Sequence, residues 1–192
     1  IFLSSWFRDY LYIPLGGSKG GTWMKVKNTF IIFLVSGFWH GANWTFIIWG
    51  FLNALYIMPS ILFKTNRNNL DIVAKGKLLP SLKELFSMGI TFSLTVFAWI
   101  FFRSKSVACA FDYISGIFSK SLFSLPTIRP ANLFLLLFIF MVIEWFGREE
   151  QFAIAKLGFK FPKIIRLIIY YAIILAIFYY GNEEQQFIYF QF

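Results

Sequence analysis

The longest run without Asp, Glu, Lys or Arg extends from Asn28 to Phe63, over 36 residues. One helix of that length would measure about 54 Å at 1.5 Å per residue, whereas the hydrocarbon core of a bilayer is about 30 Å thick. The run must therefore break, tilt steeply or re-enter. Two glycines and several polar side chains interrupt the apolar pattern in SGFWHGAN, residues 36–43. We expect a short helix at about 28–39, a break near His40 and a longer helix at about 43–62.

Three further runs, at 85–102, 130–146 and 167–180, are each close to the shortest length that spans a membrane as a helix. Hydrophobic residues make up 58% of the chain and charged residues 14%, against about 45–50% and 25% in soluble domains. The sequence therefore predicts an all-α fold, a polytopic transmembrane helical bundle. Its net charge of +9 does not indicate a nucleic-acid partner, because the basic residues are scattered between apolar runs and suit a lipid bilayer.

The polar connections between these runs lie at 64–83, 104–129 and 147–163. Apolar residues recur at helical spacing in 107–118, which predicts an amphipathic helix at the membrane interface. Several Lys and Arg in 64–83 and 147–163 place both loops in the cytoplasm and the C-terminus outside, although 104–129 also holds basic residues.

His40 is the only histidine of the chain and lies inside the longest apolar run. An ionisable residue at membrane depth usually faces a polar cavity or the bundle interior, and imidazole suits proton transfer near neutral pH. The alternative is a structural histidine that joins two helices by hydrogen bonds. We expect no metal site, because no second His or Cys lies near His40. The one cysteine, Cys109, excludes an internal disulfide and is expected to be buried or lipid-facing.

The segment SSWFRDYLYIPLGGSKGG at 4–21 is a second candidate site. Arg8 and Asp9 are adjacent, and four glycines follow within six residues around Lys19. Such a loop either cradles a phosphate with its backbone N–H groups or forms an interfacial turn. Further along, Glu144 and Arg148 have the i,i+4 spacing of an ion pair at a helix end.

Four segments together resemble a known family: SSWFRDYLYIPLGG, SGFWHGANWTFIIWG, FAWIFFRSKSVACAFDYISGIF and the terminal FIYFQF. They are similar to the membrane-bound O-acyltransferases, and within them to the bacterial alginate O-acetyltransferase branch with its polysaccharide and peptidoglycan relatives. The D-alanyl-transferring branch is a weaker match. The resemblance covers nearly the whole chain, so we expect 1–192 to be the C-terminal part of a single membrane domain whose N-terminal part is missing.

The resemblance implies a multi-pass protein of the bacterial cytoplasmic (inner) membrane. It implies transfer of an acetyl group from a cytoplasmic donor, acetyl-CoA, to hydroxyls of an extracytoplasmic polysaccharide, with partner acetyltransferase proteins and no bound cofactor. The histidine of the family's WHG motif corresponds to His40, as catalytic base. A second family histidine would precede Ile1, and Asn53-Ala54 stands where many relatives have His-Gly. We therefore expect the isolated chain to be inactive.

The residues themselves suggest further roles at this site. Acyl transfer needs a base and a donor for the developing oxyanion. Asn43, or the indole N–H of Trp39 or Trp44, can donate to that oxyanion, and Arg8 can meet phosphates of the donor. A transporter or channel subunit with His40 in a substrate or proton pathway, and an inactive scaffold, are the alternatives from other classes.

Overall fold

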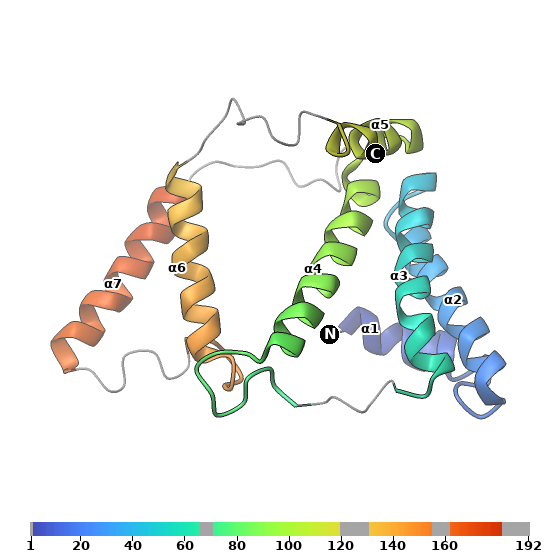
Figure 1. Ribbon diagram of the computed structural model, residues 1–192, viewed down its shortest axis with the longest axis horizontal. Coiled ribbons are helices and arrows are strands. Elements are labelled where there is room, and N and C mark those ends of the chain that lie inside the picture. Colours follow the sequence, from blue (N-terminus) through green and yellow to red (C-terminus); the bar gives the residue numbers. More distant parts are fainter. Residues whose placement is uncertain (1, 66–70, 120–130, 155–161, 182–192) are drawn as a thin grey trace. The chain divides into compact units, whose positions relative to one another are not determined.

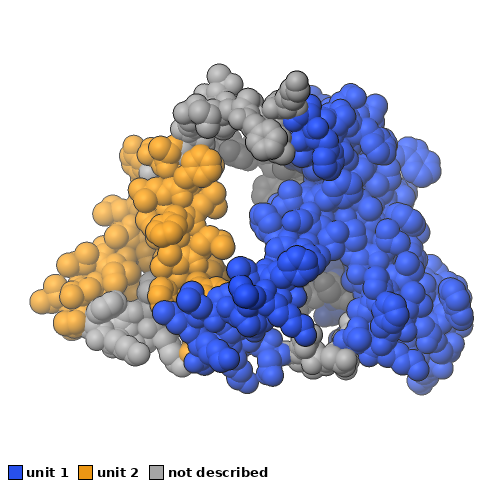
Figure 2. All heavy atoms as spheres, in the orientation of Figure 1, with its two compact units in different colours: residues 1–127 blue, residues 128–192 orange. Residues whose placement is uncertain are grey.

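The computed structural model describes residues 2–65, 71–119, 131–154 and 162–181, and the regular structure in these ranges is helical (Figure 1). Its elements are α1 (Phe2–Phe7), the π-helical η1 (Arg8–Tyr12), α2 (Gly21–Trp39), α3 (Trp44–Leu62), α4 (Leu82–Arg103), α5 (Val107–Ile117), α6 (Ala131–Gly147) and α7 (Lys163–Tyr180). They belong to two compact units, residues 1–127 and 128–192 (Figure 2). The prediction of an all-α fold is confirmed.

Helices α2 and α3 form an antiparallel hairpin that is the centre of the first unit (Figure 1). The two backbones touch at a pair of glycines. A Cβ atom on Gly50 would meet the carbonyl of Phe33, and one on Gly37 would meet the carbonyl of Phe46. Small residues at a helix–helix contact permit this close approach, which is a common way for helices to associate in membranes.

The predicted break near His40 is confirmed as the turn between these two helices. Helix α2 ends at Trp39, and Gly41 has a φ of 148°, which favours glycine. Asn43 then caps α3, because its side-chain oxygen accepts a hydrogen bond from the N–H of Thr45 at 3.1 Å.

The start of α2 differs from the prediction. The helix begins at Gly21 rather than near residue 28, and it includes Lys25 and Lys27. Lysine is a good helix former, and its long stem carries the charge away from apolar surroundings. The charge-free run therefore predicted the apolar part of α2 but not its first turns. Helices α2 and α3 are each 19 residues long.

Helix α4 packs against α3 and α5. Its first turn is held by a capping box: Glu84 accepts from the N–H of Ser81 at 2.7 Å, and the Ser81 hydroxyl accepts from the N–H of Glu84 at 3.3 Å. Helix α5 confirms the helix predicted at 107–118. It is tied to α4 by an edge-on contact of Phe101 with Phe111, whose ring centroids lie 5.8 Å apart.

Within the described residues, α3 and α4 are the two helices both long and apolar enough to cross a membrane. Large apolar side chains on α4 lie in the open, with Phe86 and Phe92 more than 70% exposed. So much exposed apolar surface is unusual for a soluble protein, and it suits a helix that faces lipid. The membrane orientation of the loops stays a prediction.

In the second unit, α6 and α7 cover most of the predicted runs 130–146 and 167–180. The ion pair predicted between Glu144 and Arg148 is wrong. The guanidinium of Arg148 instead lies 4.4 Å from the ring centroid of Trp145, donates to that residue's carbonyl at 2.6 Å and lies 3.9 Å from Glu149. Helix α6 ends at Gly147, so residue 148 no longer continues the helix face of residue 144. The terminal FIYFQF lies outside the described residues.

Candidate active site

His40 lies in the turn at the end of α2, within a group of aromatic rings. Its backbone N–H donates to the carbonyl of Gly37 at 3.1 Å, so the residue continues the last helical turn. The imidazole meets the rings of Trp39, Trp49 and Phe102 edge-on, at centroid separations of 5.1, 5.3 and 5.1 Å. These rings come from α2, α3 and α4, so the packing of three helices fixes the position of the only histidine.

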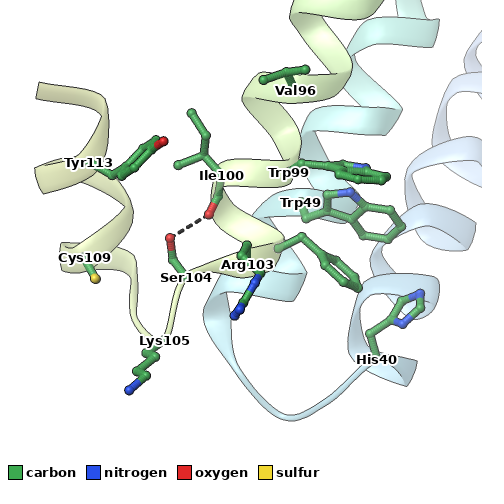
Figure 3. Close-up of a pocket in the computed structure, with 11 residues that line it drawn as sticks. His40, Trp49, Val96, Trp99, Ile100, Arg103, Ser104, Lys105, Cys109 and Tyr113 are labelled. Carbon is green, nitrogen blue, oxygen red and sulfur yellow. Dashed lines mark hydrogen bonds between the residues drawn. The ribbon is translucent and has the colours of Figure 1, made fainter. Parts of the chain in front are cut away.

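His40 forms part of the wall of a hollow of about 930 Å³ (Figure 3). Helix α4 supplies the largest part of the wall, and the rest comes from α3, α5, the turn that holds His40 and the turn between α4 and α5. The lining residues used below are Trp49, Phe102, Arg103, Lys105, Cys109 and Tyr113. The wall is mostly apolar, with a few polar groups at defined places, which is the usual make-up of a small-molecule site.

The charged groups of this hollow are both cationic. Arg103 ends α4, and Lys105 lies in the turn that leads to α5. No acidic side chain is among the described residues that line it. The hydroxyl of Ser104 donates to the carbonyl of Ile100 at 2.6 Å, so its proton is occupied (Figure 3). An imidazole beside apolar rings and two cations suits a reaction in which negative charge develops on a bound substrate.

Asn43 lies beside the hollow without lining it. Its Nδ2 donates to the carbonyl of Lys105 at 3.0 Å, and its Oδ1 accepts from the N–H of Thr45 at 3.1 Å. The amide therefore holds the turn of His40 against the turn between α4 and α5. The oxyanion role predicted for Asn43 would compete with these two hydrogen bonds.

The other predicted site residues lie outside the hollow. Trp39 contacts the His40 ring, although about half of its surface is exposed, and Trp44 is 74% exposed. Arg8 in η1 is paired with Asp9, with 2.7 Å between Nε and Oδ1. That hydrogen bond from Arg8 holds the pKa of the exposed Asp9 carboxyl below its usual value. The roles predicted for these three residues stay predictions.

The glycine-rich loop is folded against the start of α2. The side-chain amide of the fully buried Asn28 donates to the carbonyls of Leu15 and Gly17 at 3.1 and 3.0 Å. Gly16, Gly17 and Gly21 have φ values of 94°, 55° and 82°, which favour glycine in turns. The loop is therefore an anchored turn, and phosphate binding by its backbone stays a prediction.

Sequence reasoning did not single out Arg103, Lys105, Tyr113 or Phe102 as site residues. They lie 62 to 73 residues after His40, in the segment FAWIFFRSKSVACAFDYISGIF. No spacing rule connects them with His40, because the packing of α4 and α5 on the hairpin brings them there. Cys109, predicted to be buried or lipid-facing, is exposed and lines the hollow.

Comparison with protein families matches residues 1–92 to the model of the membrane-bound O-acyltransferase family (MBOAT). The chain is 35% identical to a probable alginate O-acetylase of Pseudomonas aeruginosa over 85% of its own length and 30% of that protein. It is also 35% identical to a peptidoglycan O-acetyltransferase of Helicobacter pylori, over 61% of its own length and 21% of that protein. The chain thus spans about 30% or less of the length of these curated relatives.

A teichoic acid D-alanyltransferase of Lacticaseibacillus rhamnosus is a more distant relative, 26% identical over 50% of this chain and 26% of that protein. No solved structure matches the chain. His40 and its motif lie inside the residues that the family model matches, whereas Arg103 and Lys105 lie beyond them.

Proposed function

The chain belongs to the membrane-bound O-acyltransferase family, and on that premise we propose that it contributes the catalytic base, His40, to an enzyme that O-acetylates a polysaccharide. The observation that carries this proposal is the place of His40, the one histidine of the chain, in the wall of an apolar hollow whose described lining residues include two cations and no acidic residue. An alginate-like or peptidoglycan-like acceptor is supported by the names of two relatives.

The reaction is a transfer of acetyl from a thioester to a hydroxyl. The acceptor oxygen attacks the thioester carbonyl while the imidazole of His40 takes the hydroxyl proton. The carbon–sulfur bond then breaks, and the same proton passes to the leaving thiolate, which departs as a thiol. A positioned base contributes about 10²–10⁴-fold to such a rate. Arg103 and Lys105 stabilise the negative charge that develops on the carbonyl oxygen.

The two substrates reach His40 from opposite sides of the membrane in this proposal. The basic loop 64–83 follows α3 at the end of the hairpin opposite His40, and basic loops lie mostly in the cytoplasm. The His40 turn then lies toward the outer side, where an extracytoplasmic glycan and partner acetyltransferase proteins can approach. The donor, acetyl-CoA, enters from the cytoplasm of a bacterial cell and reaches His40 through the bundle.

His40→Gln in the full-length protein that carries these residues tests the proposal. Glutamine keeps a hydrogen-bonding side chain but takes up no proton near neutral pH, so acetyl transfer should fall by at least about 100-fold. Transfer is measured with labelled acetyl-CoA and membranes that hold the acceptor glycan. Asn53→Ala is the matched control: it removes another polar group from the apolar run, one that donates to the Trp49 carbonyl, and it should retain activity.

Two further measurements separate a base from a structural histidine. The melting temperature of the variant in detergent, and the rate at which a maleimide labels Cys109 in the same hollow, should both stay close to wild type. A structural histidine predicts instability instead, because an unsatisfied buried partner costs about 1–3 kcal/mol. Acetylation at the wild-type rate by His40→Gln would refute the role of His40 as catalytic base. Transfer from a D-alanyl donor in place of acetyl-CoA would show that the acyl group is D-alanyl.

A further inference from the structure

A second hollow, of about 790 Å³, lies at the other end of the α2–α3 hairpin. Its walls come from three segments: η1 with the glycine-rich loop, the first half of α2 and the last turns of α3. Thr29, one of its lining residues, is eleven residues before His40, a separation of about 16 Å along the helix axis. Among the residues that the structure describes, none lines both hollows.

Two polar faces meet in this hollow. Thr22, Lys25 and Thr29 have the spacing i, i+3, i+7 and so share one face of α2. Ser60 and Lys64 come from the end of α3 and the residues just after it. Because the hairpin is antiparallel, the start of α2 lies beside the end of α3, and Lys25 and Lys64 line the same hollow.

Most of its hydrogen-bond donors have no protein partner. Within the described part of the chain, the ammonium groups of Lys25 and Lys64 form no ion pair, and the hydroxyls of Thr22 and Thr29 form no hydrogen bond. No acidic residue is among the described residues of the wall. Two cations and several hydroxyl donors without an acid form a site for an anion rich in acceptor oxygens.

The third wall is held in place by hydrogen bonds. Tyr12 and Ser18 are joined by a hydrogen bond of 2.9 Å between their hydroxyl oxygens. The buried Asn28 fixes the same loop to α2 through the carbonyls of Leu15 and Gly17. The loop side of the hollow is therefore fixed by contacts that do not involve Lys25 or Lys64.

The opposite side of the hollow is apolar. This side is lined by Ile32 and Phe33 of α2 and by Ile57 of α3. These residues extend the hollow from its charged end toward the middle of the hairpin. A ligand for this hollow therefore combines an anionic head with a less polar remainder. A carboxylate offers two acceptor oxygens, whereas a phosphate offers more acceptors, and lysine is a common phosphate binder.

We propose that this second hollow binds a phosphate group, with Lys25 and Lys64 as the charged contacts and Thr22, Thr29 and the Tyr12–Ser18 pair as hydroxyl contacts. The phosphate belongs either to an anionic phospholipid of the bilayer or to the nucleotide part of the acyl donor. The nucleotide alternative rests on the proposed acyl transfer, whereas the phosphate site itself does not. Binding, rather than catalysis, is therefore the quantity to measure.

The experiment uses the full-length protein in lipid nanodiscs with two probes. Adenosine 3′,5′-bisphosphate, measured by equilibrium dialysis, represents the nucleotide, and phosphatidylglycerol retained in native mass spectrometry represents the lipid. The variant Lys25→Gln/Lys64→Gln should lower the affinity for the probe by about 100-fold, which is about tenfold for each lost charged contact. The control Lys19→Gln/Lys27→Gln removes the same charge from lysines outside the hollow and should change binding by less than about threefold.

Saturable binding of either probe that only the Lys25/Lys64 variant loses supports the site and identifies the source of the phosphate. Equal loss in both lysine variants, or binding of neither probe by the wild type, overturns it. The variant Thr22→Val/Thr29→Val keeps the shape and the charge and should still weaken binding about tenfold. If the Thr22→Val/Thr29→Val variant bound the probe with unchanged affinity, the lysines would attract it by their charge alone. That result would also overturn the assignment. Melting temperatures verify that each variant is folded.

Discussion

At the scale of single residues, Asn43 connects two turns that are 62 residues apart in the sequence. One end of its amide caps α3 through the N–H of Thr45, and the other end holds the carbonyl of Lys105. The first contact is local, and an asparagine before an apolar helix predicts it. The second depends on how α4 and α5 pack, so the sequence alone did not indicate it.

Substitutions of Asn43 should separate these two contacts. Asn43→Asp keeps the acceptor that caps α3 but loses the donor to the Lys105 carbonyl. The free energy of unfolding should therefore fall by about 0.5–1.5 kcal/mol. Asn43→Ala loses both contacts, and the lost cap adds about 0.5–2 kcal/mol. Thermal unfolding in detergent measures the difference, and hydrogen exchange of residues 40–46 locates it. If both variants melt like wild type, Asn43 does not hold the His40 turn.

The sequence indicates His40 as a site residue but does not indicate Arg103. A single imidazole inside an apolar run is conspicuous from composition alone, and the structure places it in the wall of a hollow that is mostly apolar rather than polar. An arginine at the end of an apolar helix is ordinary, because such ends commonly carry basic residues. Its place beside His40 follows from tertiary packing, which no short-range pattern contains.

At the scale of elements, apolar runs predicted the positions of the helices better than their first residues. The predicted helix at 43–62 and the observed α3 differ by one residue, because an apolar run and a capping asparagine coincide there. Helix α2 begins seven residues before the predicted start, since lysines are tolerated in the first turns of a helix. Charge is therefore a poor boundary marker where a long side chain can reach polar surroundings.

The glycine contact between α2 and α3 gives a test at this scale. Gly50→Ala introduces a Cβ atom against the carbonyl of Phe33, so the helices must separate, at a cost of about 1–3 kcal/mol. Gly89→Ala is the matched control on α4, where a Cβ atom would meet nothing within 4 Å. It should be neutral or stabilising by up to about 1 kcal/mol, because alanine is the better helix former.

Melting temperatures of the two glycine variants in the same detergent provide the comparison. Loss of stability in Gly50→Ala alone supports close packing of the hairpin. Similar melting of both variants would contradict it and would imply that α2 and α3 are farther apart than the structure has them. The rate of Cys109 labelling should also rise in Gly50→Ala, if separation of the hairpin widens the hollow around His40.

At the scale of the whole molecule, the first unit carries both hollows at opposite ends of one hairpin. Lys64, at the start of the basic loop, and the phosphate site proposed above lie at one end, and His40 lies at the other. Helix α4 has the length and composition of a membrane span, and it leads from the loop that holds Lys75 to the turn that precedes Cys109. The chain therefore offers two positions whose sides of the membrane can be compared directly.

Lys75 and Cys109 should lie on opposite sides of the membrane, because a single crossing of α4 separates them. A membrane-impermeant maleimide applied to intact cells should label Cys109, the one cysteine within residues 1–192, in a protein whose cysteines outside this range are replaced by serine. It should fail to label the variant Lys75→Cys/Cys109→Ser until the membrane is permeabilised, in keeping with a cytoplasmic loop rich in lysine. Lys156 is also predicted to be cytoplasmic, but it lies outside the described residues. Labelling of both cysteines from the same side would contradict α4 as a span, whereas reversed labelling would keep the span and invert the orientation, so that His40 would lie toward the cytoplasm.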